Sequence, residues 1–88
     1  MSANRVVRCY VCPDQLTFSA NLPTGALFKG FIVRERVEAV FIVDPEVATT
    51  VTRNFRVVRE DEPFAATGLT WLGMVDYRGT NWFVGEVV

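Results

Sequence analysis

The sequence predicts a small all-β domain, an antiparallel sandwich or barrel of about six to seven short strands with at most one short helical turn. Short apolar or alternating segments recur about every ten residues and are separated by turn residues. The 88 residues leave room for a single core, so we expect residues 1–88 to form one domain. Half of the residues are hydrophobic, which excludes a disordered composition.

The clearest strand signal lies within residues 31–44. Residues 40–43 form a continuous apolar run rich in β-branched side chains, which predicts a strand buried on both faces. Charged residues at 34, 35, 36 and 38 separate this run from the preceding apolar arm. We therefore predict a hairpin with a solvated turn.

The remaining segments predict the other elements in chain order. The expected strands cover residues 6–11, 16–22, 26–33, 37–43, 55–59, 69–77 and 82–88. Gly30 predicts a bulge or a close backbone approach within its strand. Asp44 and Pro45 have the residue types of a helix start, but residues 49–52 are poor helix formers, so we expect one or two helical turns or a plain loop. Residues 64–68 lead into the sixth strand.

The residue types that most catalysis needs are missing. The chain contains no histidine, which removes Ser–His and Cys–His nucleophile pairs, an imidazole base and histidine metal ligands. It also contains no phosphate-binding glycine loop and no nucleophile elbow. The acidic cluster at residues 60–62 precedes a proline and is typical of a solvated loop. We therefore expect no enzyme activity, no catalytic residue and no cofactor.

Cys9 and Cys12 form a C-x-x-C spacing that suggests a redox or zinc site. A zinc site would lack its other two ligands, because the chain has no second cysteine pair and no histidine. In a regular strand the two side chains point to opposite faces, so they cannot bridge unless Pro13 ends the strand early. We expect free thiols and no metal.

Charge and hydropathy limit the partners. The net charge of -1 argues against a general nucleic-acid binder. The N-terminus lacks the apolar core of a signal peptide and no apolar run reaches membrane-spanning length, so we expect a cytoplasmic protein without a membrane partner. Every cation except Lys29 is an arginine, which suits bidentate recognition of phosphate or carboxylate. A GC-rich coding sequence explains the same bias equally well.

The last hairpin is the strongest candidate for a binding surface, because it concentrates large aromatic side chains around an arginine at its tip. If its turn is centred on Gly79, then Gly73 lies opposite Gly85, and the paired glycines leave a slot for a flat ring. The alternative is that the aromatics form the core and the arginines are solvated. The candidate ligand- or partner-binding residues are Arg34, Arg36, Arg56, Arg59, Trp71, Tyr77, Arg78 and Trp82.

A succession of short segments carries a family resemblance. These segments are residues 22–26, 43–46, Arg53 with Phe55 and Val57, residues 67–68 and residues 73–75. In this order they resemble a family of short, uncharacterised β-rich proteins encoded by tailed bacteriophages and prophages. Relatives tend to end in an aromatic-Val-aromatic segment that often holds a histidine, and this chain departs from them over residues 83–88.

The resemblance implies a phage context and a β-fold in the host bacterial cytoplasm, and it implies no mechanism. One expected function is a non-enzymatic counter-defence protein that binds a host defence protein or a nucleotide second messenger. The arginines would then hold phosphates or acidic side chains, and the aromatics would stack. The alternative is a structural or accessory virion or assembly protein that associates through strand edges. We expect a homo-oligomer in either case, because a small core gains from association. A sequence-independent single-strand binder ranks third, since the net charge is negative.

Overall fold

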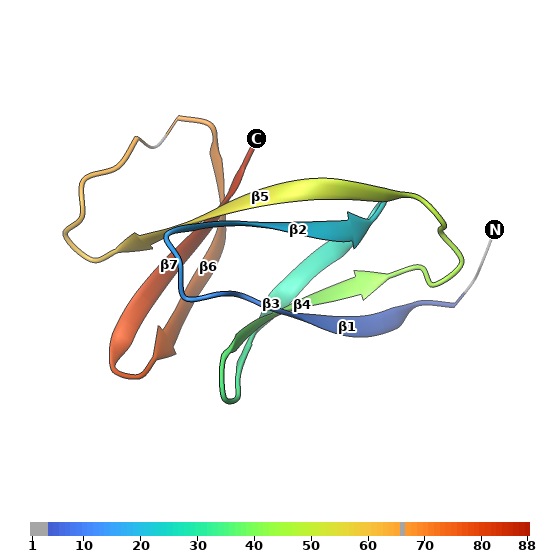
Figure 1. Cartoon of the computed structure of the whole chain (residues 1–88), viewed down its shortest axis with the longest axis horizontal. Helices are drawn as coiled ribbons and strands as arrows, with labels where there is room; N and C mark the ends of the chain where they lie inside the picture. The colour runs from blue at the N-terminus through green and yellow to red at the C-terminus, as the bar shows by residue number, and fades with distance from the viewer. Residues whose placement is uncertain (1–3, 66) are drawn as a thin grey trace.

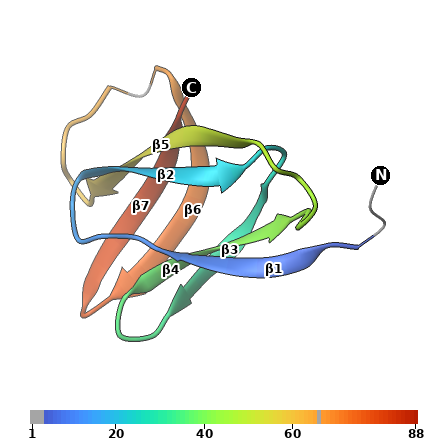
Figure 2. The same ribbon diagram turned by 45° about the vertical axis from the view of Figure 1, so that its right-hand side comes forward.

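Two antiparallel sheets pack face to face in the computed structural model, which describes residues 4–65 and 67–88 (Figures 1 and 2). The strands found in these residues are β1 (Val6–Val11), β2 (Thr17–Pro23), β3 (Leu27–Val33), β4 (Val37–Val43), β5 (Thr50–Arg59), β6 (Leu69–Tyr77) and β7 (Thr80–Val87). The three-stranded sheet has the order β1-β4-β3, and the four-stranded sheet has the order β2-β5-β7-β6. The predicted all-β sandwich is therefore confirmed.

Strand β4 is the central strand of its sheet and alternates strictly in burial. Its odd-numbered residues, Val37 to Val43, are buried against the other sheet, whereas Glu38, Val40 and Ile42 are half-buried on the outer side. The prediction of a strand buried on both faces is thus wrong. A second layer covers only one face, and the flanking strands β1 and β3 shield the other face in part.

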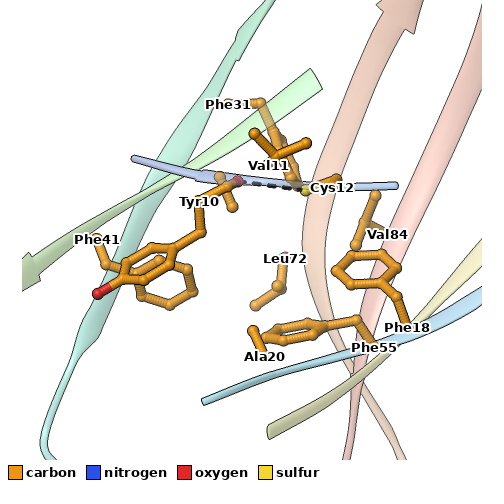
Figure 3. Close-up of a pocket in the computed structure, with 11 residues that line it drawn as sticks. Tyr10, Val11, Cys12, Phe18, Ala20, Phe31, Phe41, Phe55, Leu72 and Val84 are labelled. Atoms are coloured by element: carbon orange, nitrogen blue, oxygen red, sulfur yellow. Dashed lines mark hydrogen bonds between the residues drawn. The ribbon is translucent and has the colours of Figure 1, made fainter. Parts of the chain in front are cut away.

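The core between the sheets is filled by aromatic and branched side chains (Figure 3). Phe41 is the largest fully buried side chain, and the rings of Tyr10 and Phe28 meet its ring edge-on at 5.8 and 5.6 Å. On the opposite sheet, Phe18 stacks on Phe55 at 5.1 Å. The cavity left among these rings is about 10 Å³, close to the space of one water molecule, so the core has no room for a ligand.

Two bulges change the register of the strands. The first, between Phe28 and Gly30, is the predicted irregularity at Gly30 and is confirmed. The second lies between Trp71 and Gly73 in β6, and it places Trp71 opposite Gly85. The predicted pairing of two glycines, and the slot between them, is therefore wrong. The physical reason is the two-residue turn at Arg78 and Gly79, which pairs Tyr77 with Thr80 and so sets Gly73 opposite Val84.

The connection from β4 to β5 contains a turn and no helix. A carboxylate oxygen of Asp44 accepts a hydrogen bond of 3.0 Å from the backbone amide of Glu46. The Asp44 carbonyl accepts a hydrogen bond from the backbone amide of Val47. Strand β5 then begins at Thr50 rather than at Phe55, because the β-branched residues 50–52 pair with β2. The predictions for the N-terminus and for the segment 64–68 include residues 1–3 and residue 66. These residues lie outside the part of the chain that the structure describes.

Candidate binding site at the hairpin end

Two hairpin turns lie at the same end of the sandwich, the β3–β4 turn over residues 34–36 and the β6–β7 turn over residues 78–79 (Figure 1). The hydroxyl of Tyr77 donates a hydrogen bond of 2.6 Å to the backbone carbonyl of Glu35 and so ties one hairpin to the other. Between them is an open cleft of about 410 Å³, which we call the hairpin cleft. Its lining includes Cys12, Asp14, Glu35, Arg36, Tyr77, Arg78 and Trp82.

The structure brings most of the predicted site residues to this end. The hairpin cleft is lined by four of them, Arg36, Tyr77, Arg78 and Trp82. Arg59 lines a hollow of about 90 Å³ that shares residues with the cleft. Arg34 lines a third hollow, beside the 34–36 turn. Two predicted residues lie elsewhere. Arg56 and Trp71 both pair with Gly85 in adjacent strands, on the outer face of the four-stranded sheet.

Trp82 forms the floor of the hairpin cleft and is not a free stacking surface. Its side chain is buried, and its ring meets the ring of Tyr77 edge-on at 5.7 Å. The guanidinium of Arg59 lies 5.8 Å from the centre of the indole ring. The aromatic rings of the cleft therefore pack against the guanidinium groups of arginines. Positive charge, rather than an open ring face, is the main chemical feature of the cleft.

The arginines in and beside the hairpin cleft differ in how well they are paired. The Arg59 Nη2 atom lies 3.6 Å from an oxygen of Asp14, and the Arg59 Nε atom is buried without a hydrogen-bond partner in the described part of the chain. Arg34 pairs loosely with Glu38 at 3.8 Å. Within residues 4–65 and 67–88, the guanidinium groups of Arg36 and Arg78 have no ion pair. These two groups flank the cleft with unneutralised charge.

Arg78 occupies a backbone conformation that arginine rarely adopts. Its φ of 52° and the φ of 75° at Gly79 define a two-residue turn of type I′ between Tyr77 and Thr80. Asparagine, aspartate or glycine is preferred at the first of these positions, since a larger side chain in the left-handed region is strained. Such strain is concentrated at functional sites in proteins, so the residue type at position 78 points to a role beyond the turn.

Both cysteines are free thiols, and they differ in environment. Cys12 is buried at the inner side of the cleft, whereas Cys9 is partly exposed. Burial, opposed in part by a backbone hydrogen bond from Ala39, raises the pKa of Cys12 to about 11. At neutral pH this thiol is protonated and is not a nucleophile. The described residues contain no cluster of three side chains suited to a metal ion.

Sequence reasoning missed the carboxylates of the cleft. Asp14 and Glu35 lie among the arginines, and Asp14 makes the ion pair with Arg59. No local pattern marks Asp14, because it meets Arg59 only when distant strands pair. Among the described residues, no helix has the length and apolar character needed to cross a membrane.

No protein-family model, no curated protein and no solved structure matches this chain.

Proposed function

We propose that this chain is a non-enzymatic binding protein that takes an anionic partner in the hairpin cleft. In the phage context that its sequence suggests, it would counteract a bacterial defence system in the host cytoplasm by binding an effector protein or its nucleotide signal. The observation that carries the proposal is the meeting of Arg36 and Arg78 at one cleft, both without an ion pair in the described chain, with Arg59 in the adjoining hollow.

The chemistry of the lining supports this class of partner. Guanidinium groups bind phosphate and carboxylate oxygens through paired, charge-assisted hydrogen bonds. The cleft volume of about 410 Å³ lies within the range of small-molecule sites. Asp14 and Glu35 add acceptors at the same place, which suits a ligand that carries hydroxyl or amino groups beside its negative charge. A nucleotide has this combination, and so does an acidic protein segment.

A ligand screen by thermal unfolding tests the proposal, because a molecule that binds only the folded state raises the melting temperature. The probes are linear and cyclic mono- and dinucleotides, and host lysate serves for capture of a defence protein. We expect the double variant R36A/R78A to lose the melting shift or the captured protein. The matched control is Arg56→Ala, because Arg56 lies on the outer face of the four-stranded sheet. Equal loss in the control, or no partner in either assay, would contradict the proposal.

A structural role in the virion or its assembly is the second candidate. It is favoured by the exposed apolar side chains on the outer face of the three-stranded sheet, which include Val7 and Leu27. Such a protein would be present in purified phage particles at a fixed number of copies, and quantitative mass spectrometry of the particles would detect it. A counter-defence protein would instead be found only in infected cells.

A further inference from the structure

A hollow of about 340 Å³ lies on the outer face of the four-stranded sheet, and we call it the aromatic hollow. Its apolar wall is formed by Val58, Phe64, Trp71 and Phe83. Val58 is buried although it is not part of the core between the sheets, because successive strand residues such as Val57 and Val58 point to opposite faces. A small apolar cluster outside the main core therefore forms this wall.

The indole of Trp71 is held in place and yet remains accessible. Its ring meets the ring of Phe64 edge-on, with the ring centres 5.3 Å apart and the ring planes at 88°. The two side chains are 47% and 39% exposed. Trp71 pairs with Gly85, which has no side chain to cover the indole from β7. The aromatic hollow therefore offers an aromatic surface, which the hairpin cleft lacks.

The other wall of the aromatic hollow is acidic. It is formed by three consecutive carboxylates, Glu60, Asp61 and Glu62. None of them takes part in an ion pair within residues 4–65 and 67–88. Arg59 also lines the hollow, but its guanidinium pairs with Asp14 at 3.6 Å. Arg56 lies on the same face of the sheet and does not line the hollow. The charge of the hollow is thus negative beside an exposed aromatic ring.

We propose that the aromatic hollow binds an arginine side chain from a basic segment of a partner protein. The face of an indole attracts a cation, and carboxylates beside the ring pair with the same cation. A guanidinium satisfies both walls, because it is planar enough to stack on a ring and donates paired hydrogen bonds to a carboxylate. An ammonium group is more strongly hydrated and does not stack.

The same two walls disfavour other ligands. An acidic protein segment or a nucleic acid would be repelled by three unpaired carboxylates. In the described part of the chain these carboxylates form no group suited to a metal ion. A cationic side chain with an apolar stem matches the acidic wall with its charge and the aromatic wall with its stem.

This proposal goes beyond the proposed function, because the aromatic hollow and the hairpin cleft select opposite charges. No residue lines both sites. The R36A/R78A variant, which tests the cleft, should bind an arginine peptide as the wild type does. Failure at one site is therefore distinguishable from failure at the other.

Fluorescence anisotropy with a labelled peptide of alternating arginine and glycine tests the aromatic wall. We expect Trp71→Ala to weaken binding by about tenfold. The matched control is Met74→Ala, because Met74 is 68% exposed on the same face and does not line the hollow. Both side chains are exposed, so both variants should fold, and a melting curve of each verifies this. No binding by the wild type, or an equal loss in the control, overturns the proposal.

The triple variant E60Q/D61N/E62Q tests the acidic wall and does not depend on the folding of Trp71→Ala. It keeps the shape of the side chains, and asparagine tolerates the φ of 64° at position 61. We expect binding to weaken by about tenfold and to become less sensitive to salt. Asp76→Asn is the matched control, since Asp76 is exposed on β6 outside the hollow. A loss in the triple variant with full binding by a folded Trp71→Ala would show diffuse charge attraction and overturn the site.

Two further readouts test the ligand itself. Trp71 and Trp82 are the two tryptophans of the chain, and Trp82 is buried. The arginine peptide should therefore shield Trp71 from quenching by acrylamide. A lysine–glycine peptide of the same length should bind more weakly, because its ammonium groups do not stack. Equal affinity for the two peptides, or unchanged quenching, would overturn the assignment of arginine to the hollow.

Discussion

Arg53 on β5 holds both carboxylate oxygens of Glu86 on β7, with its Nε and Nη2 atoms each 2.6 Å from one oxygen. The carboxylate raises the pKa of Arg53 above its ordinary value. The third nitrogen, Nη1, donates to the backbone carbonyl of Ala26 at 2.8 Å, and the guanidinium lies 5.3 Å from the centre of the Phe41 ring. Arg53 thus joins the four-stranded sheet to the β2–β3 turn and to the core of the other sheet.

Removing the carboxylate from this pair should destabilise the fold. Glu86→Ala leaves the guanidinium of Arg53 partly buried without its anion, and we expect a loss of about 1–3 kcal/mol in the free energy of unfolding. Urea denaturation measures this loss. The double variant R53M/E86L tests whether the cost comes from the orphaned charge, because it should be more stable than Glu86→Ala. A Glu86→Ala protein that unfolds at the wild-type urea concentration would contradict the role of the pair.

The hydrogen bond between the two hairpins should hold the hairpin cleft in shape. Tyr77→Phe removes the donor to the Glu35 carbonyl, and we expect a loss of about 1 kcal/mol in stability. Amide hydrogen exchange over residues 34–36 should become faster. Tyr10→Phe is the matched control, since no hydrogen bond of the Tyr10 hydroxyl is found among the described residues. Equal exchange rates in the two variants would show that the bond does not order the turn.

Replacing Arg78 at the tip of the last hairpin should make the fold more stable and the binding of a partner weaker. Arg78→Asn relieves the left-handed strain at a φ of 52°, and we expect a gain of about 0.5–1 kcal/mol in the free energy of unfolding. The same change removes a guanidinium from the hairpin cleft and should weaken an anionic partner. Thermal unfolding with and without the partner measures both effects. A variant that is less stable than the wild type would contradict the strain at this turn.

Burial of Cys12 should make stability fall in alkaline solution. The folded state holds the thiol proton up to a pKa of about 11, whereas the unfolded chain releases it near 9.0. Between these values the folded state binds more protons, so the free energy of unfolding decreases as the pH rises, by about 2–3 kcal/mol in all. Denaturation of the wild type and of Cys12→Ala across this range isolates the effect. The stability advantage of the wild type should shrink with pH, and a constant difference would exclude the proposed linkage.

The positions of the strands could be predicted from the sequence, because alternation of side chains and turn residues are local properties. The predicted ranges of β1, β4 and β6 match the structure, and those of β2 and β3 match it to within a residue at each end. The prediction was wrong where one local sequence pattern was compatible with two different structures. The threonine-rich segment 49–52 was predicted to lie in a short helical turn or a plain loop, yet its β-branched residues 50–52 extend β5 once β2 supplies a pairing partner.

The candidate site, like the strands, could be predicted only in part. Residue type alone selected the arginines and aromatics, because guanidinium groups and rings have a defined recognition chemistry wherever they occur. Their positions could not be predicted. Arg36 and Arg78 meet at one cleft only because β3–β4 and β6–β7 turn at the same end of the sandwich, whereas the register of β5 and β6 with β7 directs Arg56 and Trp71 to another face.

The sequence by itself determined that this protein is an all-β domain with arginine-rich turns, since periodicity and turn chemistry act over a few residues. Tertiary structure decided the pairing of β1 with β4 and of β2 with β5, the bulge that sets Trp71 opposite Gly85, and the Arg53–Glu86 pair. The physical reason is that these contacts join residues far apart in the chain. Their geometry depends on how all of the strands pack together, and no local pattern encodes it.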